Sequence, residues 1–118
     1  MKNIVVYIAG PYKAESKSEV VHNIWSAACA AEQVRREGLV AIVPHLESMW
    51  HEDAIPECQW LEHMLILLSR CDAFFDIRHG MKSHGTEIER TRAIELGIPV
   101  FEDFLQLIEW SENIRITE

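Results

Sequence analysis

The segment Ser83–Glu89, which reads Ser-His-Gly-Thr-Glu-Ile-Glu, combines residues that suit the start of a helix with residues that can do chemistry. Ser83 can cap a helix by accepting a backbone N–H group, and Gly85 allows a ligand to approach the backbone closely. Unpaired N–H groups and the helix dipole at such a start favour an anion. The same pattern also fits an ordinary helix cap that binds nothing, so the segment alone leaves both interpretations open.

Glu89 is the residue of this segment with the most chemical potential. At 3.6 residues per turn, Gly85, Thr86, Glu89, Ala93 and Leu96 share one arc of a helix, which places Glu89 on the packing face. A carboxylate in such a place is rarely left unpaired unless it is satisfied or used. We therefore expect Glu89 either to be a functional group with a perturbed pKa or to form a salt bridge with a neighbouring arginine.

Strand-like and helix-like patterns alternate along the chain and must position these residues. The predicted strands are Ile4–Ala9, Leu39–Val43, Ala73–Ile77 and Val100–Phe101, and the predicted helices are Ser18–Arg36, Glu57–Arg70, Gly85–Leu96 and Phe104–Trp110. An irregular loop is predicted from His45 to Pro56, and its length suggests a function. This alternation predicts an α/β domain with right-handed crossovers, a parallel sheet and helices on both of its faces.

Ligands of such sheets bind beyond the carboxyl ends of the strands, where several candidate binding residues lie. Gly10 and Pro11 form a turn that brings Tyr7 to this edge, although a plain turn with Tyr7 in the core explains the same residues. His45 directly follows a strand-ending proline and is interpreted as a polar residue that lines the pocket. Asp76, at the exit of the third strand, can face the ligand.

Other residues with chemical potential give weaker signals. The six histidines show neither an HExxH motif nor a zinc-binding Cys/His spacing, so we expect no metal and no other cofactor. Cys29, Cys58 and Cys71 form no CxxC pair and are interpreted as reduced core or near-core residues. Trp50 and Trp60 can stack on a base or pack in the core or at a subunit interface, and the sequence does not decide.

Length and composition narrow the class of protein. A chain of 118 residues suits a single domain that spans residues 1–118. No apolar run is long enough to cross a bilayer and no secretory signal is recognised, so we expect a cytoplasmic protein without a membrane partner. The formal net charge of −8 argues against binding to a nucleic-acid polymer, but a small anionic ligand is compatible with a helix N-terminus.

Several motifs, taken in order, resemble the nucleoside 2-deoxyribosyltransferase superfamily, and in particular its small members that carry a domain of unknown function. The motifs are Tyr7-Ile8-Ala9-Gly10-Pro11, Pro44-His45, Arg70-Cys71-Asp72-Ala73, Ser83-x-Gly85-x-x-x-Glu89, and Ala93 followed by Gly97-Ile98-Pro99-Val100. Their order and spacing over residues 3–102 carry the resemblance. It implies a doubly wound, flavodoxin-like or Rossmann-like sheet of about four to five strands, a nucleoside or nucleotide as ligand, and a homodimer or higher homo-oligomer.

The resemblance also implies roles for single residues. In characterised members the glutamate that matches Glu89 attacks the anomeric carbon of the sugar and displaces the base, as in retaining glycosidases. Tyr7 would be the hydroxyl that orients this glutamate. Serine at the position of Ser83 accompanies hydrolysis of nucleoside monophosphates, so Ser83 and Gly85 would cradle a 5′-phosphate. Arg78 and Lys82, in a loop more basic than a neutral nucleoside requires, could reach that phosphate.

One departure from the family pattern concerns the helix before the third strand. Characterised relatives carry an aspartate there, eight residues ahead of the position of Asp72, and this chain has Met64 instead. Glu62 and His63 are near in sequence but would point elsewhere. Either another group takes the aspartate's role or the chain lacks the usual glycosyl chemistry.

Three functions therefore stand as hypotheses. The leading one is cleavage or transfer of the N-glycosidic bond of a nucleoside 5′-monophosphate or nucleoside, with Glu89 as nucleophile. The rival is a binding module that holds a nucleotide or nucleoside as a signal without turnover. The third is a protein–protein adaptor that depends on Trp50 or Trp110 and on the acidic surface.

Overall fold

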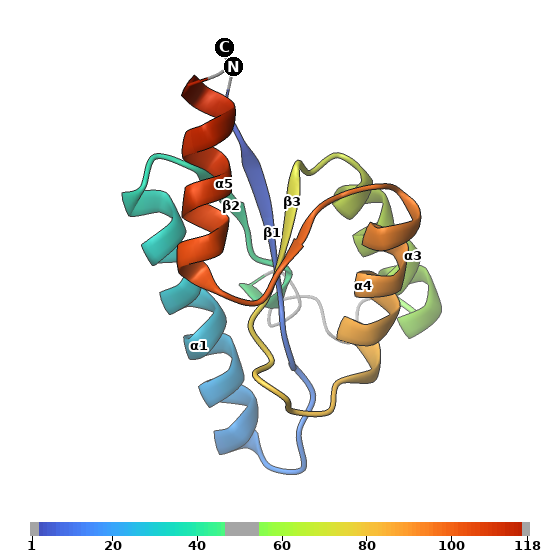
Figure 1. Cartoon of the computed structure of the whole chain (residues 1–118). Coiled ribbons are helices and arrows are strands. Elements are labelled where there is room, and N and C mark those ends of the chain that lie inside the picture. Colours follow the sequence, from blue (N-terminus) through green and yellow to red (C-terminus); the bar gives the residue numbers. More distant parts are fainter. Residues whose placement is uncertain (1–2, 47–54, 117–118) are drawn as a thin grey trace.

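The computed structural model describes residues 3–46 and 55–116, and in this part of the chain strands and helices alternate as predicted (Figure 1). The elements are β1 (Val5–Ala9), α1 (Lys17–Arg36), β2 (Val40–Ile42), α3 (Glu57–Ser69), β3 (Ala73–Asp76), α4 (His84–Glu95), β4 (Val100–Phe101) and α5 (Phe104–Ile116). The strands form one parallel four-stranded sheet in the order β2-β1-β3-β4. The prediction of an α/β fold with a doubly wound parallel sheet is confirmed.

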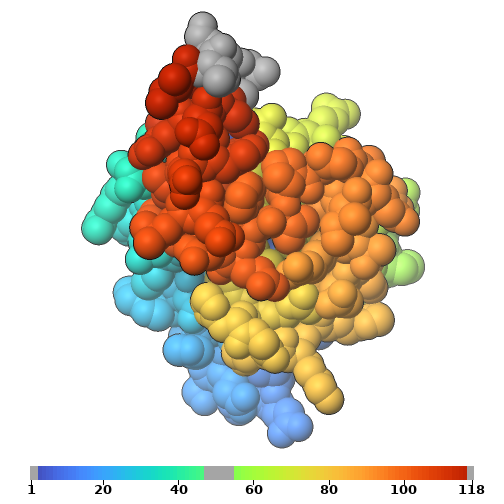
Figure 2. Space-filling model, viewed as in Figure 1, coloured from blue at the N-terminus to red at the C-terminus, as the bar shows by residue number. Residues whose placement is uncertain are grey.

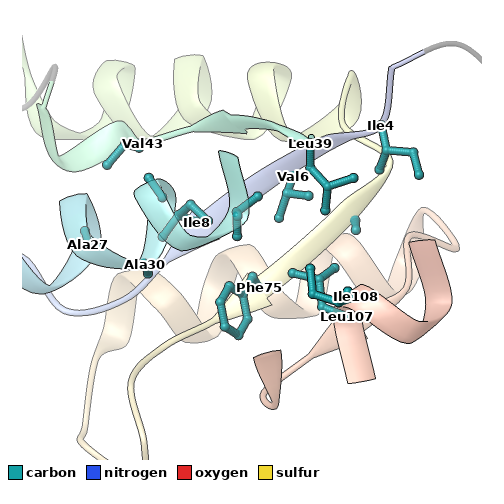
Figure 3. Close-up of a cluster of buried hydrophobic side chains, with 13 residues drawn as sticks. Ile4, Val6, Ile8, Ala27, Ala30, Leu39, Val43, Phe75, Leu107 and Ile108 are labelled. Atoms are coloured by element: carbon teal, nitrogen blue, oxygen red, sulfur yellow. The ribbon is translucent and has the colours of Figure 1, made fainter. Parts of the chain in front are cut away.

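The side chains of β1 alternate between two apolar layers, one on each face of the sheet. Val6 and Ile8 pack with α1 and α5 on one face, in the cluster drawn in Figure 3. Tyr7 and Ala9 pack on the other face with α3 and α4. Figure 1 shows α1 and α5 on one side of the sheet and α3 and α4 on the other. The strand is therefore buried on both faces, which explains its nearly continuous apolar sequence.

The strand order places the carboxyl ends of β1 and β3 side by side, where the two halves of a doubly wound sheet diverge and ligands bind. The Ile77 N–H group donates to the Ala9 carbonyl at 2.8 Å just beyond the last paired residues. A Cβ atom on Gly10 would lie 2.7 Å from Ile77 Cγ1. Glycine is thus required here for packing, and backbone forms the floor of this edge.

The ends of several elements differ from the predictions for identifiable reasons. Helix α4 begins at His84 because Ser83 caps it. Residues 44–46 are helical, since the Leu46 N–H group donates to the Val43 carbonyl at 3.1 Å, so the predicted irregular loop begins as a helical turn. Helix α5 continues well past Trp110, and Arg115 near its end donates to the carbonyls of Glu37 and Gly38.

The cysteine prediction is correct only for Cys71, which is buried. Cys29 and Cys58 are exposed, because their helices turn these positions away from the sheet. None of the helices within residues 3–46 and 55–116 is long and apolar enough to cross a membrane.

The two glycines of the candidate site should respond oppositely to alanine. Gly10→Ala should lower the free energy of unfolding by about 1–3 kcal/mol because of the overlap with Ile77. Gly85→Ala should raise it by about 0.5–1 kcal/mol, since no atom lies within 4 Å of the added Cβ and alanine favours a helix. Urea denaturation measures both. A Gly10→Ala protein as stable as the wild type would contradict the packing argument.

Candidate functional site

Tyr7 and Glu89, which lie 82 positions apart, meet in the layer between the sheet and α4, where the Tyr7 hydroxyl donates a hydrogen bond to a Glu89 carboxylate oxygen. Tyr7 is fully buried in the middle of β1, and its ring stacks on Phe74 at a centroid distance of 5.8 Å. Glu89 lies between the buried residues Thr86 and Ala93 on the packed face of α4. The sheet thus fixes the tyrosine and the helix brings the carboxylate to it.

The Glu89 carboxylate has no cationic partner among residues 3–46 and 55–116. The neighbouring arginines are engaged elsewhere, Arg90 with Asp76 and Glu102 and Arg92 with Glu95, so the predicted alternative of a salt bridge from Glu89 to a neighbouring arginine is not found. Burial raises the pKa of Glu89 to about 7. The hydrogen bond from Tyr7 acts in the opposite direction, and the charge of Asp76 adds to the rise.

Asp76 contrasts with Glu89, because two guanidinium groups satisfy its carboxylate. Its side chain is 2% exposed, and Arg78 Nη2 and Arg90 Nη1 each lie 2.9 Å from its Oδ2 atom. The Arg78 backbone N–H group also donates to Asp76 Oδ1 at 3.0 Å. Asp76 therefore neutralises cations at the end of β3 and has no free carboxylate for a ligand.

The same arginines reach two further carboxylates. Arg78 Nη1 lies 2.6 Å from Glu87 Oε2, and Arg90 Nη1 lies 2.6 Å from Glu102 Oε1. We call Asp76, Arg78, Glu87, Arg90 and Glu102 the ion-pair cluster. The cluster joins the end of β3 to the first turns of α4 and to the residue after β4. Arg78, predicted to reach a phosphate, is thus held by carboxylates of the protein itself.

The start of α4 is capped from within. Ser83 Oγ accepts the Thr86 N–H group at 3.3 Å and exchanges a hydrogen bond with Thr86 Oγ1 at 2.7 Å. Gly85 is exposed, and so is Leu96, which lies one residue beyond the helix. The prediction that both share the packed face is wrong, since the contact with the sheet is restricted to the arc of Thr86, Glu89 and Ala93.

His45 lies against the turn after β1. Its Nε2 atom is 3.0 Å from the Pro11 carbonyl oxygen. Its ring packs edge-on against that of Tyr12, with a distance of 6.0 Å between the ring centroids. Burial lowers the pKa of His45, although hydrogen bonds with the Pro11 and Gly10 backbone oppose this effect. In the neutral ring Nε2–H donates to Pro11, which leaves Nδ1 as an acceptor. Among the described residues Nδ1 is buried without a hydrogen-bond partner, which is unusual for a buried polar atom.

The remaining residues considered from the sequence make contacts that stabilise the fold. Asp72 accepts the Val5 N–H group at 2.8 Å and so ties the starts of β1 and β3 together, whereas Met64 is buried in the core. Trp60 stacks on His63, with the ring centroids 5.7 Å apart. Trp110 packs against Phe101 with a centroid distance of 5.4 Å, so it belongs to the core cluster and does not form an exposed patch. Trp50 lies outside the described residues.

A shallow groove of about 260 Å³ lies between α3 and α4. It is lined by Leu65, His84, Glu87, Ile88, Thr91, Arg92 and Glu95, and it contains neither Tyr7 nor Glu89. We therefore place the candidate site at the half-buried Glu89 carboxylate and its Tyr7 partner rather than at this groove. Within the described part of the chain, no three His, Cys, Asp or Glu side chains come together as a metal site would require.

Sequence reasoning missed Arg90 and Glu102 as members of this region. Arg90 directly follows Glu89, so its proximity could have been inferred, but its partners depend on how β3 and β4 approach α4. Glu102 directly follows a predicted strand, so its position at the carboxyl end of that strand was a weaker indication that it belongs to the site.

Glu89→Gln should make the protein more stable at alkaline pH. A pKa raised to about 7 means that ionisation of Glu89 disfavours the fold. This effect is absent below the unfolded-state pKa, grows as the pH rises toward 7, and is complete above that value. The gain should approach roughly 3 kcal/mol above pH 8 as an upper limit and vanish near pH 4. Urea denaturation at several pH values measures it, and a pH-independent difference would contradict the raised pKa.

Comparisons with known proteins do not assign the chain to a family. No protein-family model matches the chain, and a search of curated proteins finds no matching relative.

Proposed function

We propose that this protein cleaves or transfers the N-glycosidic bond of a nucleoside or nucleoside 5′-monophosphate, with Glu89 as the nucleophile. The observation that carries the proposal is the half-buried Glu89 carboxylate on the packed face of α4, which Tyr7 Oη holds and which no cation neutralises among the described residues. A carboxylate that is partly withdrawn from water without an opposite charge destabilises the fold, and such arrangements are typical of functional sites.

The reaction would proceed in two displacements. A Glu89 carboxylate oxygen forms a bond to the anomeric carbon, the bond from that carbon to the base nitrogen breaks, and the base leaves with the electron pair and takes up a proton. Water, or the nitrogen of a second base, then attacks the anomeric carbon of the glycosyl ester. This step restores the Glu89 carboxylate, and the incoming nucleophile loses a proton.

The surroundings of Glu89 suit each of these steps. Among the described residues the Tyr7 hydroxyl and no cation stabilise its ionised form, which keeps the carboxylate reactive. The Tyr7 hydroxyl aims the reacting oxygen and stabilises the carboxylate when it is released. The fixed ring of Tyr7, stacked on Phe74, keeps this geometry from varying.

Two features leave room for the remainder of a nucleoside. Gly85, four residues before Glu89 on α4, has open space where a side chain would be. His45 Nδ1, which has no hydrogen-bond partner among residues 3–46 and 55–116, can accept a hydrogen bond from a hydroxyl or amino group of a ligand. The resemblance to nucleoside 2-deoxyribosyltransferases supports the same assignment, and the homo-oligomer that it implies stays a prediction.

A second candidate, a non-catalytic module that binds a nucleoside or nucleotide, is favoured by Met64. In the enzymes that the chain resembles an aspartate stands at this position, whereas Met64 is buried and apolar. Without that carboxylate the site can bind a nucleoside through Glu89 and Tyr7 and leave the glycosidic bond intact.

Loss of base release in the variants is the test of the enzymatic proposal. The protein is incubated with pooled ribo- and deoxyribonucleosides and their 5′-monophosphates, with and without a free acceptor base, and base release is followed by chromatography. Glu89→Gln should lower kcat/KM by about a thousandfold or more, and Tyr7→Phe by about 10- to 100-fold.

Glu95→Gln on the same helix is the matched control and should keep wild-type turnover, because Glu95 pairs with Arg92 away from Tyr7. Full turnover by Glu89→Gln would exclude the mechanism. Saturable binding without base release would favour the binding module.

Activity should rise with pH through about 7, because the nucleophile must be ionised and the pKa of Glu89 is raised to about 7. Asp76→Asn should move the rising limb of kcat/KM to lower pH, since the charge of Asp76 helps to raise that pKa. Initial rates across the pH range measure both effects. An unchanged profile in Asp76→Asn would show that the two carboxylates are not coupled.

A further inference from the structure

The start of α4 is where the 5′ end of a bound sugar would lie, an argument that rests on the proposed function. Glu89 and Gly85 are four residues apart, which corresponds to about 6 Å along a helix. The 5′-oxygen of a furanose lies four bonds from the anomeric carbon, so a sugar bound at Glu89 can cover most of this distance. A sugar that presents its anomeric carbon to Glu89 and extends along α4 therefore reaches the loop 78–82 and the first turn of the helix. Figure 2 shows this loop in yellow on the molecular surface, beside the orange surface of α4.

The ion-pair cluster gives this end of the site a net negative charge. Its two guanidinium groups, Arg78 and Arg90, are shared among the three carboxylates of Asp76, Glu87 and Glu102. The Arg78 side chain is only 14% exposed and donates to both Asp76 and Glu87. A phosphate would have to displace one of these carboxylates, and it would then leave that carboxylate close to its own negative charge.

The lysines near this edge of the sheet do not compensate for the net negative charge of the ion-pair cluster. Lys13 is largely exposed and already pairs with Glu57, and Lys82 is exposed in the loop before α4. Charges in such positions are screened by solvent and contribute little.

The helix start itself offers an incomplete anion site. Ser83 Oγ already accepts the Thr86 N–H group, and Glu87 places a carboxylate in the first turn, where the helix dipole would otherwise attract an anion. The Ser83 hydroxyl can exchange a hydrogen bond with an uncharged 5′-hydroxyl without any change in charge.

We propose that the site selects nucleosides with a free 5′-hydroxyl over their 5′-monophosphates, and that Glu87 and Glu102 act as specificity residues by holding Arg78 and Arg90. The inference narrows the proposed function and runs against the 5′-phosphate that serine at position 83 implies by resemblance. The ion-pair cluster excludes a phosphate because its cations are already neutralised and a carboxylate excess remains.

The test compares each nucleoside with its own 5′-monophosphate. For the wild type, kcat/KM should favour the nucleoside by at least about tenfold at low salt, and the preference should shrink as ionic strength rises. Glu87→Gln should reduce the preference severalfold, because it releases Arg78 toward the ligand. Glu95→Gln, which removes a carboxylate from the same helix outside the cluster, should keep it. Glu87 is largely exposed, so the variant should fold, and a thermal melt checks this.

Binding to Glu89→Gln, measured by calorimetry with the same nucleosides and monophosphates, tests the inference without any turnover. Tighter binding of the nucleoside supports the inference even if the wild type releases no base, an outcome that would sink only the proposed reaction. Preference for the monophosphate, in rate or in affinity, overturns the inference while leaving the proposed reaction intact. An unchanged preference in Glu87→Gln also overturns it, and failure of either ligand to bind overturns both.

Discussion

The partial burial of the Glu89 carboxylate between β1 and α4 is the constraint to which the rest of the site is fitted. A carboxylate that is partly withdrawn from water is tolerated only if the surrounding structure supplies compensating stability. Here the compensation is one hydrogen bond from Tyr7, whose ring is locked against Phe74 in the middle of a strand buried on both faces. The apolar layers on both sides of β1 therefore do more than stabilise the sheet, because they hold Tyr7, the donor to the Glu89 carboxylate in the described part of the chain.

Asp76 and Glu89 show how one fold gives two carboxylates different roles. Both lie near the β1 and β3 boundary, yet Asp76 is surrounded by guanidinium and N–H donors, whereas within residues 3–46 and 55–116 Glu89 is held by the Tyr7 hydroxyl and by no cation. Asp76 therefore has a structural role, while burial raises the pKa of Glu89 to about 7, so that Glu89 lies between its two protonation states near neutral pH. The charge of Asp76 contributes to that difference, so the structural carboxylate also tunes the candidate nucleophile.

Local patterns in the sequence predicted the strand and helix order, the parallel sheet and the position of Glu89 on a packed helix face. These features depend on periodicity and on turn residues, which single segments carry. The boundaries of α5, the exposure of Gly85 and Leu96, and the surface positions of Cys29 and Cys58 were missed because they depend on how far each helix touches the sheet. The partners of Arg78 and Arg90 were beyond sequence reasoning, since three separate segments supply the carboxylates.

The absence of a side chain at Gly10 limits how this site can change over evolution. Because Ile77 fills the space beside it, no larger residue fits at the junction of β1 and β3 without repacking. New ligand preferences would therefore have to arise at exposed positions around it, such as Met81, Lys82 and Gly85, where substitution does not disturb the sheet. The site thus combines a junction of β1 and β3 that cannot change with surrounding positions that can. This arrangement lets one fold acquire different specificities while Glu89 stays in place.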